Sequence, residues 1–322
     1  MRFEKWQALG NDYLIVEERE LPFELTPARI RRLCEGHFGV FADGVLLLSP
    51  PADPSDVADL RIFNPDGSEA ELSGNGAREA VLYLRRRGWT SADGFSIGTA
   101  AGRIRPRITA PDRCRVDMGH ASLTSRDYPQ GPPDGRGRIE AGGRAWDFRH
   151  VSIGNPQCAI ALAGQEELDA IDLPAVGPAI EADPRFPNRT NVSWYAELAP
   201  AADGDGPARI RARIFERGVG ETLSSGTGAT GAAVAYVTGL RESAPTGATG
   251  AAVADVSGLA EVAPTAAAGA APAASAVVVV LEGGELEVEV GPDLHVHLSG
   301  WARPVFAGQL SPEFEKELHE TE

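Results

Sequence analysis

The sequence has few of the residues that build metal clusters or disulfide frameworks. Its 322 residues include only three cysteines, Cys34, Cys114 and Cys158, an odd number at wide spacings. These spacings match neither a zinc-ligand pattern nor the paired cysteines of a disulfide-stabilised secreted domain. We therefore expect reduced, buried thiols in a cytoplasmic protein, and no metal ion held by cysteine.

Positive charge is also scarce. The 30 Lys and Arg residues are outnumbered by 46 Asp and Glu residues, which gives a formal net charge of −16 at pH 7. A protein with this balance repels polyanions, because binding to phosphate backbones or anionic lipid depends on surplus Lys and Arg. Nucleic acid and anionic membrane are therefore excluded as general partners.

Long apolar runs are missing as well. The first seven residues lack the apolar core of a signal peptide, so we expect none. Residues 262–281 form a stretch of 20 residues without charge, which is long enough to span a membrane. The stretch is mostly Ala with interrupting Gly and Pro, and only residues 277–281 are strongly apolar, which predicts a buried strand rather than a span. No Walker loop and no clear dinucleotide fingerprint occurs, so we expect no cofactor.

Two glycine-rich turns with one shared pattern stand out. Residues 73–77 and 225–229 both read Ser-Gly-x-Gly-Ala, and each follows a strand-like run and precedes an apolar, helix-like run. Such a turn exposes backbone N–H groups at a helix N-terminus, which suits a carboxylate. One such turn alone would most simply connect two core elements. Two copies indicate similar halves that face each other and hold one carboxylate from both sides, with Ser73 and Ser225 flanking the neighbouring atom.

These turns and their surroundings resemble the diaminopimelate epimerases, a family of pyridoxal-independent amino-acid epimerases. The resemblance covers residues 1 to about 240 and about 277–310, with long motifs at 64–78 and 216–228. It implies an α+β fold of two pseudo-symmetric domains, each a mixed sheet around a central helix. The first domain would comprise residues 1–125 plus 302–322, and the second would comprise residues 126–301.

The resemblance also implies an activity and a site. The expected reaction is a cofactor-independent, two-base transfer of the α-proton of a diaminopimelate-like amino acid, in lysine and peptidoglycan precursor biosynthesis, by a cytoplasmic homodimer. The expected catalytic residues are Ser73, Ser225 and Glu216. The expected substrate-binding residues are Asn11, Asn64, Gly74, Asn75, Asn155, Asn191, Glu216, Arg217, Gly226 and Thr227.

The sequence departs from the family pattern at the catalytic positions. Ser73 and Ser225 occupy the positions of the family's two catalytic cysteines, and Gln157 replaces a histidine that tunes the site. A thiol has a pKa of about 8.5, whereas a hydroxyl resembles water at about 16. The gap of about 7 units corresponds to roughly 10 kcal/mol in forming the base, and a helix dipole offsets only about 1 to 2 kcal/mol. Glu216 is the only carboxylate that we nominate to assist.

Three functions therefore stay open at the level of sequence. The first is an epimerase of the diaminopimelate epimerase type. The second is an isomerase or dehydratase on the same scaffold that needs only one strong base. The third is a weakly active or inactive ligand-binding homologue.

A short internal repeat follows the second turn. Residues 227–246 and 246–265 are near copies with a period of 19, too short and too few for a solenoid. The copies indicate a tandem duplication, and the second lacks the Ser-Gly pair because Ala244 and Pro245 stand at those positions. We expect residues 243–275 to be an Ala-rich insertion outside the core.

His295 and His297 form the last feature of note. Their spacing of two places both on one face of a strand. No third ligand is apparent nearby in the sequence, so we expect an exposed face and no metal site.

Overall fold

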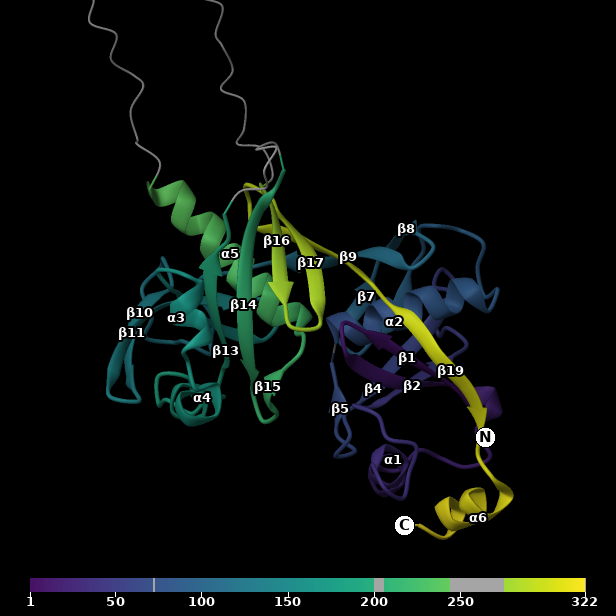
Figure 1. The fold of residues 1–322 in the computed structure, drawn as a ribbon. Coiled ribbons are helices and arrows are strands. Elements are labelled where there is room, and N and C mark those ends of the chain that lie inside the picture. Colours follow the sequence, from purple (N-terminus) through teal and green to yellow (C-terminus); the bar gives the residue numbers. More distant parts are fainter. Residues whose placement is uncertain (72, 200–205, 244–274, 322) are drawn as a thin grey trace, which may run out of the picture.

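The computed structural model describes residues 1–71, 73–199, 206–243 and 275–321. They form two mixed β-sheets in two lobes, with a long helix, α2 or α5, in each lobe (Figure 1). The α+β class and the arrangement of two mixed sheets around central helices are as predicted. The predicted insertion at 243–275 lies outside the described residues except at its two ends.

The first sheet has eight strands in the order β19-β1-β2-β3-β4-β6-β7, and β5 pairs with β4. It is mixed because β2/β3 and β4/β6 run parallel whereas the other pairs are antiparallel. Its strands are β1 (Arg2–Ala8), β2 (Asn11–Glu17), β3 (Val45–Ser49), β4 (Ala58–Phe63), β5 (Glu69–Ala70), β6 (Ile97–Thr99), β7 (Gly102–Ile104) and β19 (Arg303–Gln309).

The second sheet has eleven strands in the order β10-β11-β12-β13-β14-β16-β17-β18-β9-β8, and β15 pairs with β14. It is mixed because β12/β13 and β14/β16 run parallel. Its strands are β8 (Arg107–Ala110), β9 (Arg113–His120), β10 (Arg136–Ala141), β11 (Arg144–Ser152), β12 (Pro156–Ala161), β13 (Asn191–Glu197), β14 (Ala208–Glu216), β15 (Gly220–Thr222), β16 (Ser275–Leu281), β17 (Gly284–Val290) and β18 (His295–Trp301).

Two of the helices are central, and the others are peripheral. Small side chains let α2 and α5 sit deep in their lobes: Ala77, Ala80, Ala229 and Ala232 are all fully buried. Close packing without voids at such positions is typical of a protein core. The helices are α1 (Pro27–Cys34), α2 (Gly74–Arg86), α3 (Gln165–Asp169), α4 (Leu173–Glu181), α5 (Gly226–Ser243) and α6 (Pro312–Glu320), with a short 3₁₀ helix, η1 (Glu18–Glu20).

The chain crosses between the two sheets twice. It leaves the first sheet after β7, and β9 then pairs antiparallel with β18. It returns after β18, and β19 pairs antiparallel with β1. Strands β8 and β9 therefore hydrogen-bond into the second sheet although both precede residue 125, while the division into domains at residues 125/126 remains a proposal.

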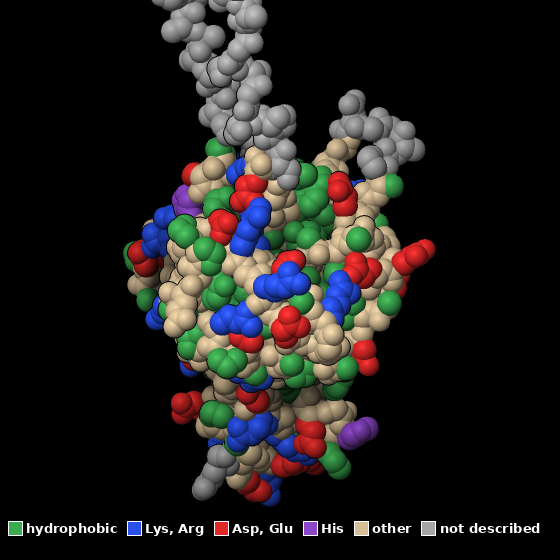
Figure 2. All heavy atoms as spheres, turned by 90° about the vertical axis from the view of Figure 1, so that its left-hand side faces the viewer, with side chains coloured by type: hydrophobic (Ala, Val, Ile, Leu, Met, Phe, Trp, Pro, Cys, Tyr) green, Lys and Arg blue, Asp and Glu red, His purple; other side chains and the backbone are tan. Residues whose placement is uncertain are grey.

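Two sequence expectations about composition can be compared with the fold. Cys34, Cys114 and Cys158 are free and buried, as expected, and burial raises the pKa of the Cys34 thiol to about 12. On the face shown in Figure 2, acidic and basic side chains are interspersed. Among the described residues, no helix is long and apolar enough to cross a membrane.

Candidate active site at the meeting of two helix N-termini

The N-termini of α2 and α5 touch at their first residues. A Cβ atom placed on Gly226 would lie 3.2 Å from the Cα atom of Gly74, and 3.1 Å from a methyl group of Leu298. A Cβ atom on Gly74 would meet the Cα atom of Gly226 at 3.3 Å. Only glycine at both positions allows this approach without a shift of the backbone. The two ends face one another between the lobes (Figure 1).

Each of these helix ends is capped by the serine of its Ser-Gly-x-Gly-Ala turn. The Oγ atom of Ser73 accepts a hydrogen bond from the amide of Gly76, and that of Ser225 from the amide of Gly228, both at 3.1 Å. An N-cap serine satisfies one of the donors that a helix start leaves without an intrahelical acceptor. Other first-turn amides remain for an anion, and they belong to Gly74, Asn75, Gly226 and Thr227.

Ser225 is paired with a carboxylate. Its hydroxyl donates to Oε2 of Glu216 at 3.0 Å, and Thr222 donates to Oε1 of Glu216 at 2.8 Å. Ser225 is 3% exposed. Burial raises the pKa of Glu216 above its ordinary value, although the two hydroxyl donors act in the opposite direction. Glu216 is thus a half-buried proton acceptor in direct contact with one of the two serines.

Ser73 is paired with a phenol. The hydroxyl of Tyr13 donates to Oγ of Ser73 at 3.3 Å, and burial raises the pKa of Tyr13. In the described part of the chain, no carboxylate hydrogen-bonds to Ser73. Sequence reasoning missed Tyr13, which follows the predicted Asn11 loop by two residues and had no pattern to mark it.

A network of amide side chains joins the two halves across the site. The Nδ2 atom of Asn75 donates to Oδ1 of Asn11 at 3.1 Å and to Oγ of Ser224 at 2.9 Å. The guanidinium of Arg78 donates to Oδ1 of Asn75 at 2.7 Å and to the carbonyl of Gly74 at 2.9 Å. Arg78 is fully buried, and burial lowers its pKa to about 10. Asn11, Gly74 and Asn75 are therefore brought together, with Ser224 as a residue that sequence reasoning missed.

The predicted residues of the second half are joined by further hydrogen bonds. Asn155 donates to Oγ1 of Thr227 at 3.2 Å, and Gln157 donates to Oδ1 of Asn155 at 2.8 Å. Gln157 is fully buried, and its hydrogen bond orients Asn155. Asn191 accepts from the backbone amide of Arg217 at 2.9 Å.

Two predicted residues lie at the margin of this arrangement. The exposed Arg217 donates from its guanidinium to the carbonyl of Asn188 at 2.9 Å. Asn64 donates to Oγ of Ser68 at 2.9 Å within its own turn. Within the described residues, the side chain of Asn64 has no hydrogen bond to the rest of the predicted set, so its visible role is to shape the turn before α2.

Comparison with known proteins shows the family of the chain. The family model described as diaminopimelate epimerase matches residues 3–124 and 149–246. The chain belongs to the diaminopimelate epimerase family. A diaminopimelate epimerase of Synechococcus sp. (strain JA-3-3Ab) is 38% identical over 316 residues, which cover 96% of this chain and 97% of the relative. One from Pelotomaculum thermopropionicum is 36% identical over 322 residues, covering 96% and 98%.

Solved structures share the fold at low sequence identity. A PhzF-family phenazine biosynthesis protein of Bacillus anthracis matches with a TM-score of 0.64 at 15% identity, covering 97% of this chain and 99% of that one. A probable proline racemase of Agrobacterium radiobacter, solved with bound carbonate, matches with a TM-score of 0.62 at 15% identity, covering 97% and 93%. At this identity the likeness extends to the fold alone.

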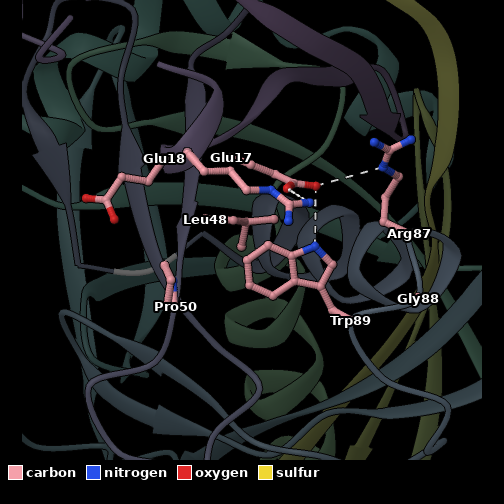
Figure 3. Close-up of a pocket in the computed structure, with 8 residues that line it drawn as sticks. Glu17, Glu18, Leu48, Pro50, Arg87, Gly88 and Trp89 are labelled. Atoms are coloured by element: carbon pink, nitrogen blue, oxygen red, sulfur yellow. Dashed lines mark hydrogen bonds and ion pairs between the residues drawn. The ribbon is translucent and has the colours of Figure 1, made fainter. Parts of the chain in front are cut away.

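A cavity of about 380 Å³ lies elsewhere in the first lobe and contains none of the predicted site residues. In Figure 3 the carboxylate of Glu17 faces the indole of Trp89 and the guanidinium of Arg87 across this cavity. Trp89 donates to Glu17 at 3.3 Å and Tyr83 donates to it at 2.8 Å. Both donors reach Oε1 of Glu17, while its Oε2 atom forms an ion pair with Arg19 at 2.5 Å.

The expectation about the two strand histidines was wrong in one respect. Asp117 of β9 lies beside His295 and His297 of β18, and donor atoms of the three side chains lie within 4.8 Å of one another. Sequence reasoning found no third ligand because Asp117 is far away along the chain, and antiparallel pairing of β9 with β18 brings it close.

Proposed function

We propose that this protein is a cofactor-independent amino-acid epimerase of the diaminopimelate epimerase type, with Ser73 and Ser225 in the two proton-transfer positions. The observation that carries the proposal is the contact between two serine-capped helix N-termini at Gly74 and Gly226. Epimerisation removes a proton from one face of a carbon and returns one to the other, so it needs two such groups opposite each other.

The substrate carboxylate fits between the two helix starts. The first-turn amides and the positive ends of two helix dipoles all favour an anion at this point. A bound α-carboxylate places the neighbouring α-carbon between Ser73 and Ser225. The amide network around Asn75 fixes the relative position of the two halves, so that this spacing is preorganised.

A free serine alkoxide is too costly to be the base at neutral pH, by roughly 10 kcal/mol relative to a thiolate. The hydrogen bond from Ser225 to Glu216 offers a cheaper route. As Oγ of Ser225 takes the α-proton, its own proton passes to the carboxylate of Glu216. The net transfer is from carbon to carboxylate, and no alkoxide accumulates on this face.

On the opposite face the hydroxyl of Ser73 gives its proton to the carbanion. As it does so, the hydroxyl of Tyr13 passes its own proton to Oγ of Ser73 along the hydrogen bond between them. Burial raises the pKa of Tyr13, but a phenol is still a stronger acid than a serine hydroxyl, so the negative charge ends on Tyr13 and no alkoxide accumulates on this face. Proton exchange with solvent restores Glu216 and Tyr13 between turnovers.

The two faces are therefore unequal. Glu216 makes Ser225 the better base, while Ser73 is the better acid. This asymmetry also favours a second candidate function, an isomerase or dehydratase that needs one strong base. The stereoisomer whose α-proton faces Ser225 should exchange that proton with deuterated water faster than the stereoisomer whose α-proton faces Ser73.

An NMR experiment on the two stereoisomers of diaminopimelate tests this proposal. Glu216→Gln should remove the difference between their exchange rates by slowing the faster one, because a neutral amide cannot accept the proton. Equal exchange rates of the two stereoisomers in the wild type would contradict the assigned roles. Exchange without formation of the other stereoisomer would favour the one-base alternative.

Substrate selection and assembly complete the proposal. Arg217 is exposed at the margin of the site, and its free guanidinium face suits the distal carboxylate of a two-headed amino acid.

We also assign a cytoplasmic location and a homodimer. The edge strand β19 carries Val305 and Phe306, 55% and 46% exposed, and a second copy would cover them. Light scattering on Phe306→Glu, which should be monomeric at concentrations where the wild type is dimeric, tests the assembly.

A further inference from the structure

A cluster of imidazole and carboxylate side chains lies on the outer face of the second sheet, away from the helix N-termini. His295 and His297 project from β18, and Asp117 projects from the neighbouring strand β9. The Nε2 atom of His295 lies 2.8 Å from Oδ1 of Asp117. All three side chains are half-buried, so the donors are accessible to solvent while their strands sit within the sheet.

A β-bulge creates this cluster. Val296 pairs with Gly119 and His297 pairs with Asp117, so Met118 is an extra residue in β9. Without it the alternation of the strand would turn Asp117 to the face of the buried Leu298. Gly119 has a φ of +75°, and its amide donates to Oδ1 of Asp117 at 2.9 Å. The bulge thus turns the carboxylate outward and fixes it beside the two histidines.

We propose that Asp117, His295 and His297 form a binding site for a divalent transition-metal ion of the zinc class. Two imidazole nitrogens and one carboxylate oxygen are a donor set that Zn²⁺, Co²⁺ and Ni²⁺ accept, with further positions open to water. Metal–ligand bonds of about 2 Å require donors somewhat closer than 4.8 Å, which small side-chain rotations supply. The ion replaces the hydrogen bond between His295 and Asp117.

Neighbouring side chains hold the three proposed ligands in place. The ring of His120 stacks on that of His295 at 4.6 Å between centroids, and its Nε2 atom lies 3.1 Å from Asp293. These contacts hold the ring of His295 in place, as second-layer contacts do at known metal sites. Glu289 pairs directly with His297 across β17 and β18. Glu289 also forms an ion pair with Arg115 at 2.7 Å, which offsets the positive charge of that guanidinium.

The consequence of binding is a link between distant parts of the chain. A bound ion ties β9 to β18, and β9 is one of the first two strands that the chain contributes to the second sheet. Because the unfolded chain cannot present the three donors together, binding stabilises the folded state by mass action. At a zinc concentration about 100 times the Kd, the ratio of folded to unfolded protein should rise about 100-fold.

Zinc titration of the full chain without an affinity tag tests the site. Calorimetry should give one Zn²⁺ per chain, and Co²⁺ should show the visible absorption of a site with nitrogen and oxygen ligands. His297→Gln and Asp117→Asn should each weaken zinc binding by roughly tenfold or more. Both changes are close in shape to the native side chains at half-exposed positions, so the fold should persist, which circular dichroism verifies.

A matched control uses a histidine outside the cluster. His37 is exposed on the first lobe, and His37→Gln should leave zinc affinity unchanged. The three cysteines are buried and do not compete. Absence of saturable binding at millimolar zinc overturns the proposal. Unchanged stoichiometry and affinity in the double variant His295→Gln, His297→Gln, or an equal loss in His37→Gln, overturns it as well.

Discussion

Replacing Ser225 with alanine should cost more stability than replacing any other capping serine. Ser225, Ser73 and Ser311 make the same cap, in which the side-chain oxygen accepts from the amide three residues later at 3.1, 3.1 and 3.2 Å. Of the three, Ser225 also donates to a carboxylate, that of the half-buried Glu216. The three alanine variants therefore separate the contribution of the cap to the free energy of unfolding from the contribution of the contact with Glu216.

The expected magnitudes follow from these contacts. Loss of the cap alone, as in Ser311→Ala, should lower the free energy of unfolding by about 1 kcal/mol. In Ser225→Ala the Oε2 atom of the half-buried Glu216 also loses its donor, which costs about 1 to 3 kcal/mol more. The total for Ser225→Ala is about 2 to 4 kcal/mol. The cost of Ser73→Ala should fall between those of the other two variants, because the group that loses its partner, the hydroxyl of Tyr13, is neutral.

The pH dependence identifies the source of the extra cost. Burial raises the pKa of Glu216 in the folded protein above the ordinary value of 4.5. Its contribution to stability is therefore fully present below pH 4.5 and is lost as pH rises through the folded pKa. Removing the hydroxyl donor of Ser225 raises that pKa further. The excess cost of Ser225→Ala over Ser311→Ala should be largest near pH 7 and should shrink toward pH 4.5.

Urea unfolding at several pH values measures these differences, provided that the slope with denaturant is unchanged between variants. Equal costs for Ser225→Ala and Ser311→Ala at pH 7 would refute the reasoning. So would an excess cost that stays constant with pH, because the contact would then not involve an ionised Glu216. Glu216→Gln combined with Ser225→Ala should lose most of the pH-dependent part.

Other predictions concern the ligand and the chain around the site. Tyr13→Phe should leave binding of diaminopimelate unchanged but slow the formation of the other stereoisomer roughly ten- to a hundredfold, because the charge that develops on Oγ of Ser73 then loses a hydrogen bond that contributes about 1.5 to 3 kcal/mol. Equal rates would remove Tyr13 from the mechanism. Arg217→Ala should weaken binding of diaminopimelate roughly tenfold or more in calorimetry, while leaving binding of an amino acid without a distal carboxylate unchanged. Shortening residues 243–275 to a brief linker should leave the fold and binding intact, and a variant that fails to fold would show that the segment belongs to the core.

Much of the fold followed from local sequence signals. The repeated Ser-Gly-x-Gly-Ala turns predicted two helices starting after Ser73 and Ser225, because a serine cap and small first-turn residues are readable along the chain. The meeting of the two helix starts also followed, since two copies of one anion site suggest a shared ligand. The close approach of Gly74 and Gly226 is the physical reason that both positions are glycine.

Features that depend on pairing between distant strands could not be predicted in this way. The bulge at Met118 and the position of Asp117 beside the two histidines follow from the register of β9 against β18. Tyr13 and Ser224 were missed because a single hydroxyl carries no sequence pattern. Their roles appear only when β2 and the turn before α5 are packed against α2. Asn64 shows the opposite case, because a motif marked it as a site residue but its side chain hydrogen-bonds within its own turn, to Ser68.

Exchange of the substrate α-proton with deuterated solvent, followed by NMR, tests the central claim most directly. The wild type and the double variant Ser73→Cys, Ser225→Cys are compared at equal concentration with diaminopimelate. The account predicts slow exchange in the wild type, much faster exchange in the double variant because a thiolate forms far more easily than an alkoxide, and similar affinity in both. No exchange in either protein, despite measured binding, would contradict the assignment of these two positions to proton transfer.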